Sequence, residues 1–327
     1  MKVALTGATG HLGAALLQEL TQSNIPVKAL VRGNDIRTCA GLPVEIIKGD
    51  LMDADTLSML MQGCDAVIHC AAVISVNGDP AGLMQQTNVA GTQLVVDIAL
   101  QAGIKRFIHI SSIHAFKQQP GIVLLDETAA PADEKTYAYG RSKYASQQIA
   151  LAANDKGMEV LVISPTSVIG PYDFKPSLMG KAIIDLYKGR LPFIFNGGFN
   201  YCDGRDVAHA IVNALTLGKP GEVYLVGGEW HSLRELTSIL SRVSSKKVRP
   251  IALSLLAGKL GLPFMKLLAA VTRKEPLYTG EVLDALFKDN RNISSNKAKT
   301  ALHYTSRPFE ETIHDTFYWF KNNGYLD

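Results

Sequence analysis

The chain has 327 residues, of which 47% are hydrophobic and 19% are charged, and its formal net charge at pH 7 is +3. This length accommodates one large α/β domain with a smaller lobe, or two domains, and the composition excludes a largely disordered protein. The small positive charge gives no reason to expect nucleic acid as a partner. The four cysteines show neither a CxxC pair nor metal-site spacing, which indicates reduced thiols and no bound metal.

The N-terminal residues read as a strand that enters a glycine turn, without the apolar stretch of a secretory signal. Nowhere do 18 uncharged apolar residues follow one another, so no transmembrane helix is expected. These features predict a cytoplasmic protein.

Short apolar runs alternate with helical patterns from residue 2 to about residue 165. Most of these runs are continuously apolar, as in strands that helices cover on both faces. Strands are predicted at 2–6, 26–31, 44–49, 65–70, 106–111 and 159–164. Helices are predicted near 11–23, 53–62, 83–102 and 139–157. This alternation predicts an α/β fold with a Rossmann-type doubly wound parallel sheet, which a further strand at 222–228 is expected to rejoin.

The remaining residues have a different character. Residues 170–200 are rich in Gly, Pro and aromatic residues, which is typical of loops and a helix, and residues 232–327 are mainly helical in pattern. We therefore expect two interleaved parts. A dinucleotide-binding domain would comprise 1–169 and about 201–229, and a smaller, mainly helical substrate lobe would comprise about 170–200 and 230–327.

A glycine-rich turn follows the first predicted strand directly and opens a helix. Gly7, Gly10 and Gly13 have the spacing with which a dinucleotide fingerprint makes a tight turn, admits a pyrophosphate and packs helix on strand. The helix N-terminus would offer free N–H groups to the phosphates. A tight turn without a ligand is the weaker alternative in this context.

The second predicted strand carries the choice of cofactor. An NAD site usually has an acidic residue about 20 residues beyond the glycines, but here the strand ends in Arg32, whose guanidinium suits the 2′-phosphate of NADP. The nearby Asp35 keeps NAD possible, and a solvated arginine is the alternative reading. Asp50, after the third strand, either accepts a hydrogen bond from the adenine amino group or caps a helix.

Tyr139 and Lys143 are four residues apart at the start of a helical stretch, and so lie on one helical face. A phenol has an ordinary pKa near ~10, and a neighbouring ammonium favours its ionised form. Tyr137 has Arg141 at the equivalent position and lacks this lysine partner. The fifth strand ends in two serines, of which Ser112 is the first choice and Ser111 the reserve for holding the substrate oxygen.

The sequence resembles the extended short-chain dehydrogenase/reductase family across essentially its whole length. TGATGHLG, KGDL, HCAA, TNVAGT, ISS, YGRSK and PTSVIGPYD all stand in the family's order, and the reductase branch with dihydroflavonol 4-reductase and 3β-hydroxysteroid dehydrogenases is the most similar. The resemblance implies catalysis by Ser112, Tyr139 and Lys143 and a dimer through 83–102 and 139–157. It implies cofactor contacts by Gly7, Thr9, Gly10, His11, Leu12, Gly13, Arg32, Asp50, Leu51, His69, Ala71, Ala72, Asn88, Tyr139, Lys143, Pro165 and Ser167. Helix packing is an alternative role for Asn88.

The same family holds nucleotide-sugar epimerases and dehydratases. Phe199 stands where epimerases often carry Arg, and Ile113 and His114 stand where dehydratases carry an acidic pair. Aromatic residues are frequent in the segments expected near the substrate, although each can also be a core residue. The predicted substrate pocket consists of His114, Phe116, Tyr172, Phe174 and Phe199, with Phe193 and Phe195 beside it.

These residues predict an NADP(H)-dependent oxidoreductase that reduces a carbonyl group of an apolar or aromatic molecule. A nucleotide-sugar epimerase or dehydratase, and a non-catalytic NADP-sensing protein, are the alternatives. Eight basic residues and no acid lie between Leu236 and Lys274. The apolar, basic segment 250–274 suggests peripheral membrane contact, with internal packing as the alternative.

Overall fold

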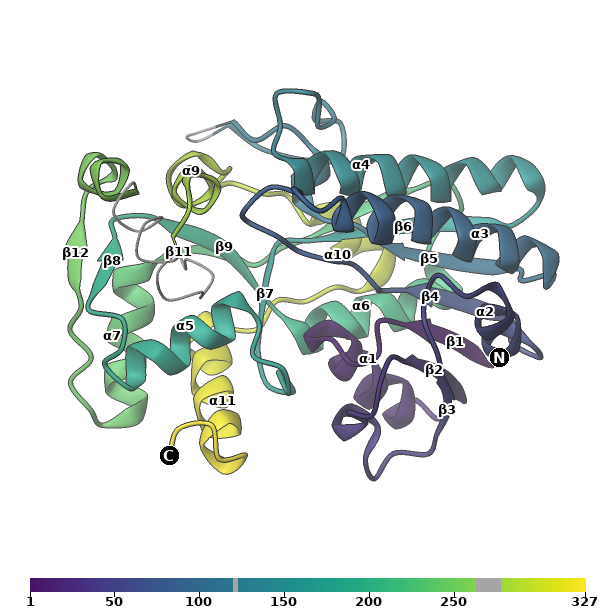
Figure 1. The fold of residues 1–327 in the computed structure, drawn as a ribbon, viewed down its shortest axis with the longest axis horizontal. Coiled ribbons are helices and arrows are strands. Elements are labelled where there is room, and N and C mark those ends of the chain that lie inside the picture. Colours follow the sequence, from purple (N-terminus) through teal and green to yellow (C-terminus); the bar gives the residue numbers. More distant parts are fainter. Residues whose placement is uncertain (120–122, 263–277) are drawn as a thin grey trace.

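The computed structural model describes residues 1–119, 123–262 and 278–327, and its largest element is a parallel sheet in the order β10-β6-β5-β4-β1-β2-β3 (Figure 1). Its strands are β1 (Val3–Thr6), β2 (Val27–Val31), β3 (Val44–Lys48), β4 (Ala66–His69), β5 (Arg106–Ile110), β6 (Glu159–Pro165) and β10 (Val223–Val226). Every neighbouring pair is parallel. The predicted Rossmann-type sheet is confirmed, and the strand expected at 222–228 rejoins it beside β6.

Helices cover both faces of this sheet (Figure 1). They are α1 (His11–Gln22), α2 (Ala54–Met61), α3 (Gly91–Gln101), α4 (Ala138–Leu151), α6 (Gly204–Leu217) and α10 (Asn296–Leu302). Val3 and Leu5 of β1 pack in a core with α1 and α6, whereas Ala4 packs in a second core with α2, α3 and α4. This division follows from the alternation of side chains along a strand, and it explains why the runs are continuously apolar.

A separate core lies beyond the carboxyl edge of the sheet, on the left in Figure 1. It is built from β7 (Ser167–Ile169), α5 (Leu178–Tyr187), β8 (Phe193–Phe195), β9 (Gly198–Asp203), β11 (Glu229–Ser232), α7 (Leu233–Ser244), β12 (Ile251–Leu253), α9 (Gly280–Lys288) and α11 (Phe309–Asn322). Strands β11-β9-β7 and β12-β8 form two small sheets. The expectation of loops and a helix for 170–200 is corrected here, because Ile194 and Phe195 are buried in this core while their backbone pairs with β12. The interleaved domain division stays a proposal.

The basic, apolar segment 250–274 falls only partly within the described residues. Ile251–Leu253 form β12, and a helix follows over 255–262 in which Leu256 and Leu260 are 69% and 74% exposed. Residues 263–274 lie outside the described residues. Among the residues that are described, no helix has the length and apolar character needed to cross a membrane. Contact with a membrane surface stays a prediction.

Candidate active site

The glycine turn between β1 and α1 has the close packing that its sequence predicts. Gly7 has φ of +75°, and a Cβ there would lie 2.6 Å from the backbone nitrogen of Ala71. A Cβ on Gly13 would lie 2.1 Å from the carbonyl oxygen of Gly7. At Gly10 the nearest atom would be 3.4 Å away, and this residue is exposed. Two glycines therefore allow close packing of the turn, and the third leaves the backbone accessible to a ligand.

The N-terminus of α1 is one of several without a side-chain cap, since among the described helices α4, α10 and α11 also lack one. Gly10 is its N-cap, and no side chain among the described residues caps it. In contrast, side chains cap α2, α6, α7 and α9; these are Asp53, Asp203, Ser232 and Thr279. Uncapped N–H groups at the positive end of a helix bind phosphate well. This turn fits the pyrophosphate of a dinucleotide.

Two predicted cofactor residues in α1 have structural contacts of their own. His11 Nε2 lies 3.0 Å from the carbonyl oxygen of Pro171, and Leu12 packs against the core between α1 and the sheet. Thr9 is half-buried in the turn itself. His11 thereby connects the glycine turn to the segment that follows β7.

The positive charge at the end of β2 is exposed and only distantly paired. The Arg32 side chain is 80% exposed, and its nearest acid is Asp50 with 3.9 Å between Nη1 and Oδ2. Asp35 instead accepts hydrogen bonds of 2.9 and 2.8 Å from Arg37, and these hold the pKa of Asp35 down at about 2. Asp50 accepts from the backbone of Met52, whereas Asp53 caps α2. The carboxylate that left NAD possible is thus engaged elsewhere.

The end of β4 is fixed by a buried histidine. His69 Nδ1 lies 2.7 Å from Thr6 Oγ1, and its Nε2 lies 3.0 Å from Thr92 Oγ1. Burial lowers the pKa of His69 to about 3, so the imidazole is neutral. Thr6 also accepts from the backbone of Ala71, while the following Ala72 is exposed. His69 therefore ties β1, β4 and α3 together beneath the cofactor region.

Asn88 joins three parts of the site. It lies in a π-helical turn, Gln85–Ala90, and is 1% exposed. Its amide accepts from the Val73 nitrogen at 2.7 Å and donates to the Val73 oxygen at 2.9 Å and to Ser142 Oγ at 3.0 Å. Asn88 thus fixes the chain after β4 against α4. Leu51 is buried in the second core, and Pro165 and Ser167 end β6 and begin β7.

The structure brings Ser112, Tyr139 and Lys143 together. Lys143 is 3% exposed, and its Nζ donates to the carbonyl oxygen of Ile110 at 2.7 Å. Tyr139 lies one turn earlier on α4, and Ser112 follows β5. The Ser112 hydroxyl is close enough to the Tyr139 phenol to lower its pKa, whereas Ser111 Oγ is buried without a partner among the described residues. Ser112 is therefore the better placed of the two serines.

Burial sets the protonation of this group. Withdrawal from water raises the pKa of Tyr139 to about 12, and the hydrogen bond to Ser112 lowers it only in part. Burial also lowers the pKa of Lys143 to about 8, although the nearby Cys70 thiol opposes this shift. From the sequence, Lys143 is expected to favour the ionised form of the Tyr139 phenol. In the protein alone this lowering of the pKa is not seen, because loss of hydration is the larger effect. The phenol is held protonated, as a proton donor requires.

Helix α9 lies opposite these groups, and the sequence did not predict this arrangement. His114 Nε2 lies 2.9 Å from Asp289 Oδ2, and the Tyr137 hydroxyl donates to Asp284 at 2.8 Å. Thr279 donates to a backbone carbonyl of the loop after β4. The partners are 147 to 203 residues apart in the sequence, and no local pattern could have revealed them.

Comparison with known proteins identifies the family. The model of the NAD dependent epimerase/dehydratase family matches residues 3–227, which include the seven-stranded sheet. The chain belongs to this family. It is an NAD(P)-dependent enzyme of the extended short-chain dehydrogenase/reductase type, and its nicotinamide dinucleotide would bind at the glycine turn described above.

Two relatives and one solved structure are similar over most of the chain. A protein of Synechocystis sp., provisionally named dihydroflavonol 4-reductase, is 30% identical over 98% of this chain and 95% of its own. Sterol demethylase protein B of Methylococcus capsulatus is 32% identical over 75% of each chain. The crystal structure of gox2253 has a TM-score of 0.85 at 32% identity, covering 100% of this chain and 99% of that one.

The aromatic residues predicted to line the substrate pocket lie in several different parts of the structure. Phe116 is 5% exposed in a small core with Leu125 and Leu225. Tyr172 packs against the core of α1 and α6, at a positive φ of 70°. Three others lie against separate aromatic partners: Phe174 against Trp319, Phe195 against Tyr278, and Phe199 against Tyr201. The fourth, Phe193, is 44% exposed. Packing explains the other positions, and a shared apolar pocket stays a prediction.

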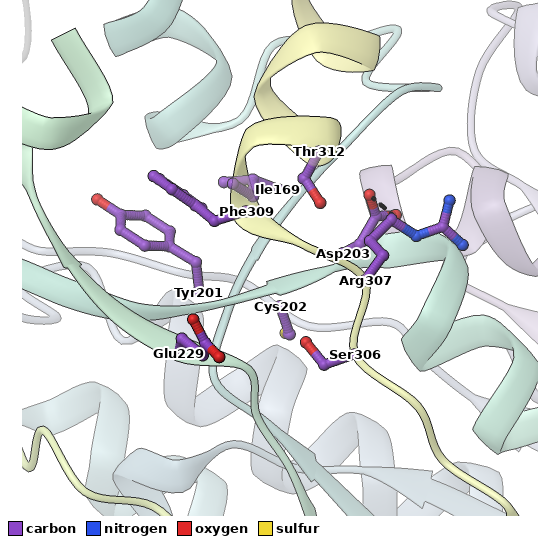
Figure 2. Close-up of a pocket in the computed structure, with 9 residues that line it drawn as sticks. All are labelled: Ile169, Tyr201, Cys202, Asp203, Glu229, Ser306, Arg307, Phe309 and Thr312. Carbon is purple, nitrogen blue, oxygen red and sulfur yellow. Dashed lines mark ion pairs between the residues drawn. The ribbon is translucent and has the colours of Figure 1, made fainter. Parts of the chain in front are cut away.

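A small pocket between β9 and α11 lies in the separate core (Figure 2). Arg307 lies beside Asp203 at one end of it, with 3.7 Å between Nε and Oδ2, and also forms an ion pair with Asp206 at 2.6 Å. Arg205 forms a second pair with Asp203 at 2.8 Å. Since its charged groups neutralise one another, this pocket joins β9 to α11 and adds no group to the candidate active site.

Proposed function

We propose that the chain is an NADP(H)-dependent reductase that converts a ketone or aldehyde group of an apolar or aromatic small molecule into an alcohol. The observation that carries this proposal is the convergence of Ser112, Tyr139 and Lys143 at the carboxyl edge of the sheet. The uncapped N-terminus of α1, at the same edge, supports the binding of a dinucleotide beside them.

The side chains support a simple division of roles. Bound NADPH would supply the hydride, which no amino-acid side chain can provide. Tyr139, held protonated, donates its phenolic proton to the oxygen of the substrate. Ser112 donates a hydrogen bond to the same oxygen as negative charge develops there. Lys143, fixed by the Ile110 carbonyl, stabilises the phenolate that remains and is positioned to hold the cofactor's ribose.

The preference for NADP rests on Arg32 and Asp35. A 2′-phosphate would meet the exposed guanidinium of Arg32, with which it can form a bidentate pair. Asp35 would otherwise accept from the 2′-hydroxyl of NAD, but it is already paired with Arg37. The NADP form should therefore bind more tightly.

The carbonyl substrate is favoured over a sugar nucleotide by the residue at position 199. Phe199 packs edge-on against Tyr201, at a position where family epimerases often carry an arginine for the diphosphate. The names of the two relatives, a dihydroflavonol reductase and a sterol demethylase component, also indicate apolar ring compounds. These names support a substrate class and do not identify one compound.

Transfer of deuterium tests the proposed function directly. NADPH carrying deuterium at its transferable position would be incubated with a panel of aromatic aldehydes, aromatic ketones and UDP-glucose. We expect one deuterium in the alcohol product, by mass spectrometry, for each NADPH oxidised. In a parallel incubation with NAD⁺ or NADP⁺, isomerised UDP-glucose without net change of the cofactor would replace this proposal with an epimerase. Tight NADPH binding without any turnover would replace it with a non-catalytic binding protein.

A further inference from the structure

His114 connects the catalytic serine to helix α9. It lies in the short turn Ile113–Ala115 that follows β5, and its Nδ1 is 3.4 Å from Ser112 Oγ. On the other side of the ring, Nε2 is 2.9 Å from Asp289 Oδ2 at the end of α9. The imidazole also lies edge-on to the Tyr139 ring, with 6.0 Å between the ring centres. His114 therefore lies between the reacting groups and a carboxylate from a distant part of the chain.

The direction of the Ser112 hydroxyl depends on the protonation of this imidazole. The carboxylate of Asp289 only accepts, so Nε2 donates to it in either state. In the neutral ring Nδ1 then carries a lone pair and draws the Ser112 hydrogen toward itself. In the imidazolium both nitrogens donate, so Ser112 Oγ accepts from Nδ1 and its hydrogen is free to turn elsewhere.

A backbone contact adds to this geometry. The His114 N–H donates to Ser112 Oγ at 3.2 Å, so the serine oxygen already accepts from the His114 side. A second donor at Nδ1 would occupy its remaining lone pair and leave the hydroxyl hydrogen for a group on the Tyr139 side.

We propose that His114, held by Asp289, is a positioning residue that orients the Ser112 hydroxyl, and that its imidazolium form turns this hydroxyl toward the substrate oxygen during reduction. This inference rests on the proposed carbonyl reduction. It assigns to Asp289 the role of retaining the imidazolium beside Ser112.

The charged groups around His114 favour this form. Asp289 and Glu281 face it from α9, Tyr139 faces it from α4, and Arg141 lies near Glu281. Burial lowers the pKa of His114, but attraction to Asp289 and Glu281 outweighs burial, so the net pKa is raised above its ordinary value. More imidazolium is thus present near neutral pH than in a free histidine.

A purely structural role for the His114–Asp289 contact predicts different behaviour. α9 is also anchored by the hydrogen bond from Tyr137 to Asp284, at 2.8 Å, and by that from Thr279 to Val76, at 2.7 Å. Tyr137→Phe likewise removes a hydrogen bond to an aspartate of the α9 region, from the start of α4 and without touching Ser112. It is therefore the matched control.

The test compares His114→Gln, Asp289→Asn and Tyr137→Phe with the wild type, using NADPH and the best aromatic aldehyde or ketone. We expect wild-type kcat/KM for reduction to fall as pH rises through the titration midpoint of His114, because the neutral ring withdraws the Ser112 hydrogen. His114→Gln should lower the acidic plateau by roughly tenfold to a hundredfold, within the range for loss of one oxyanion donor, and abolish this pH step. Tyr137→Phe should retain both plateau and step.

NMR titration of labelled imidazoles provides a readout that does not require turnover, with the His114 signal assigned by its absence in His114→Gln. Asp289→Asn should move the His114 midpoint to lower pH, and the step in kcat/KM should move with it. An unchanged midpoint in Asp289→Asn, or a step that survives in His114→Gln, would overturn the inference. Absence of carbonyl reduction in the wild type would instead overturn the proposed function, while the titration still reports on the Asp289 contact.

Discussion

The carboxyl edge of the sheet and helix α9 contribute to the site in different ways. Ser112 and Lys143 at the edge are 7% and 3% exposed, and Lys143 is bonded to the adjacent strand. The side chains of Asp284 and Asp289 in the α9 region are 23% and 15% exposed. They contact Tyr137 and His114, which are more than 140 residues away in the sequence. The edge thus supplies buried groups, one of which has an altered pKa, and α9 supplies carboxylates that contact His114 and Tyr137 beside them.

This difference predicts different consequences of substitution. Removing a buried edge group should affect both the reaction and the stability of the fold, because an ion is held away from water there. Removing an α9 carboxylate should change the pH dependence of the reaction and have a smaller effect on its maximum rate. Asp289→Asn, described above, tests the α9 side of this contrast, and the variants below test the edge of the sheet.

Lys143→Met should produce the largest combined effect. The ammonium stabilises the phenolate and is proposed to hold the cofactor, so turnover should fall at least about a hundredfold and NADPH should bind more weakly. Steady-state kinetics and fluorescence titration of NADPH measure the two losses. Lys135→Met, at an exposed lysine just before α4, is the matched control. Wild-type turnover in Lys143→Met would contradict a catalytic role.

The same variant should stabilise the fold near pH 7. Burial lowers the Lys143 pKa from 10.5 to about 8, so the folded chain binds the proton less tightly than the unfolded chain. The free energy of unfolding is therefore lowered, by the full amount below about pH 8. This loss of stability disappears as the pH rises toward 10.5. At about 1.4 kcal/mol per pKa unit it is of the order of 3 kcal/mol, before loss of the Ile110 hydrogen bond is subtracted. Denaturant midpoints should differ near pH 7 and converge near pH 10; equal midpoints at both values would contradict it.

The contrast between the two regions also explains what the sequence could predict. The strands and the Tyr139–Lys143 pair follow from local patterns: continuous apolar runs between helices, and a spacing of four residues on one helical face. Position also indicated Ser112, at the end of a strand. In contrast, the partners of His114 and Tyr137 lie on α9, and no rule of periodicity connects residues so far apart.

Other contacts in the structure could not be read from the sequence pattern either. Asp35 appeared free to bind a ribose in the sequence, but Arg37 folds back on it through two hydrogen bonds. The strand pairing of β8 with β12 depends on residues that are more than 50 positions apart. Aromatic residues indicated an apolar pocket, yet composition does not distinguish a pocket from a core, and Phe116 lies in a core.

Arg32→Ala should have a smaller and more selective effect. Loss of one charge-assisted pair with a 2′-phosphate costs ~1.5–3 kcal/mol, or roughly tenfold to a hundredfold in affinity. We expect weaker NADPH binding and nearly unchanged NADH binding, measured by fluorescence titration. Lys48→Ala, which removes one exposed positive charge at the end of the neighbouring strand β3, should change the affinity for neither cofactor. Equal affinity of the wild type for NADPH and NADH would refute the NADP assignment.

The most direct test of the central claim compares Tyr139→Phe with Tyr137→Phe in carbonyl reduction by NADPH. Both variants remove one phenolic hydroxyl, but only Tyr139 stands one turn before a lysine and has its pKa lowered in part by Ser112. We predict that Tyr139→Phe loses about 10²–10⁴-fold in kcat while retaining NADPH affinity, and that Tyr137→Phe remains close to the wild type. Wild-type kcat in Tyr139→Phe, or equal losses in the two variants, would contradict the account.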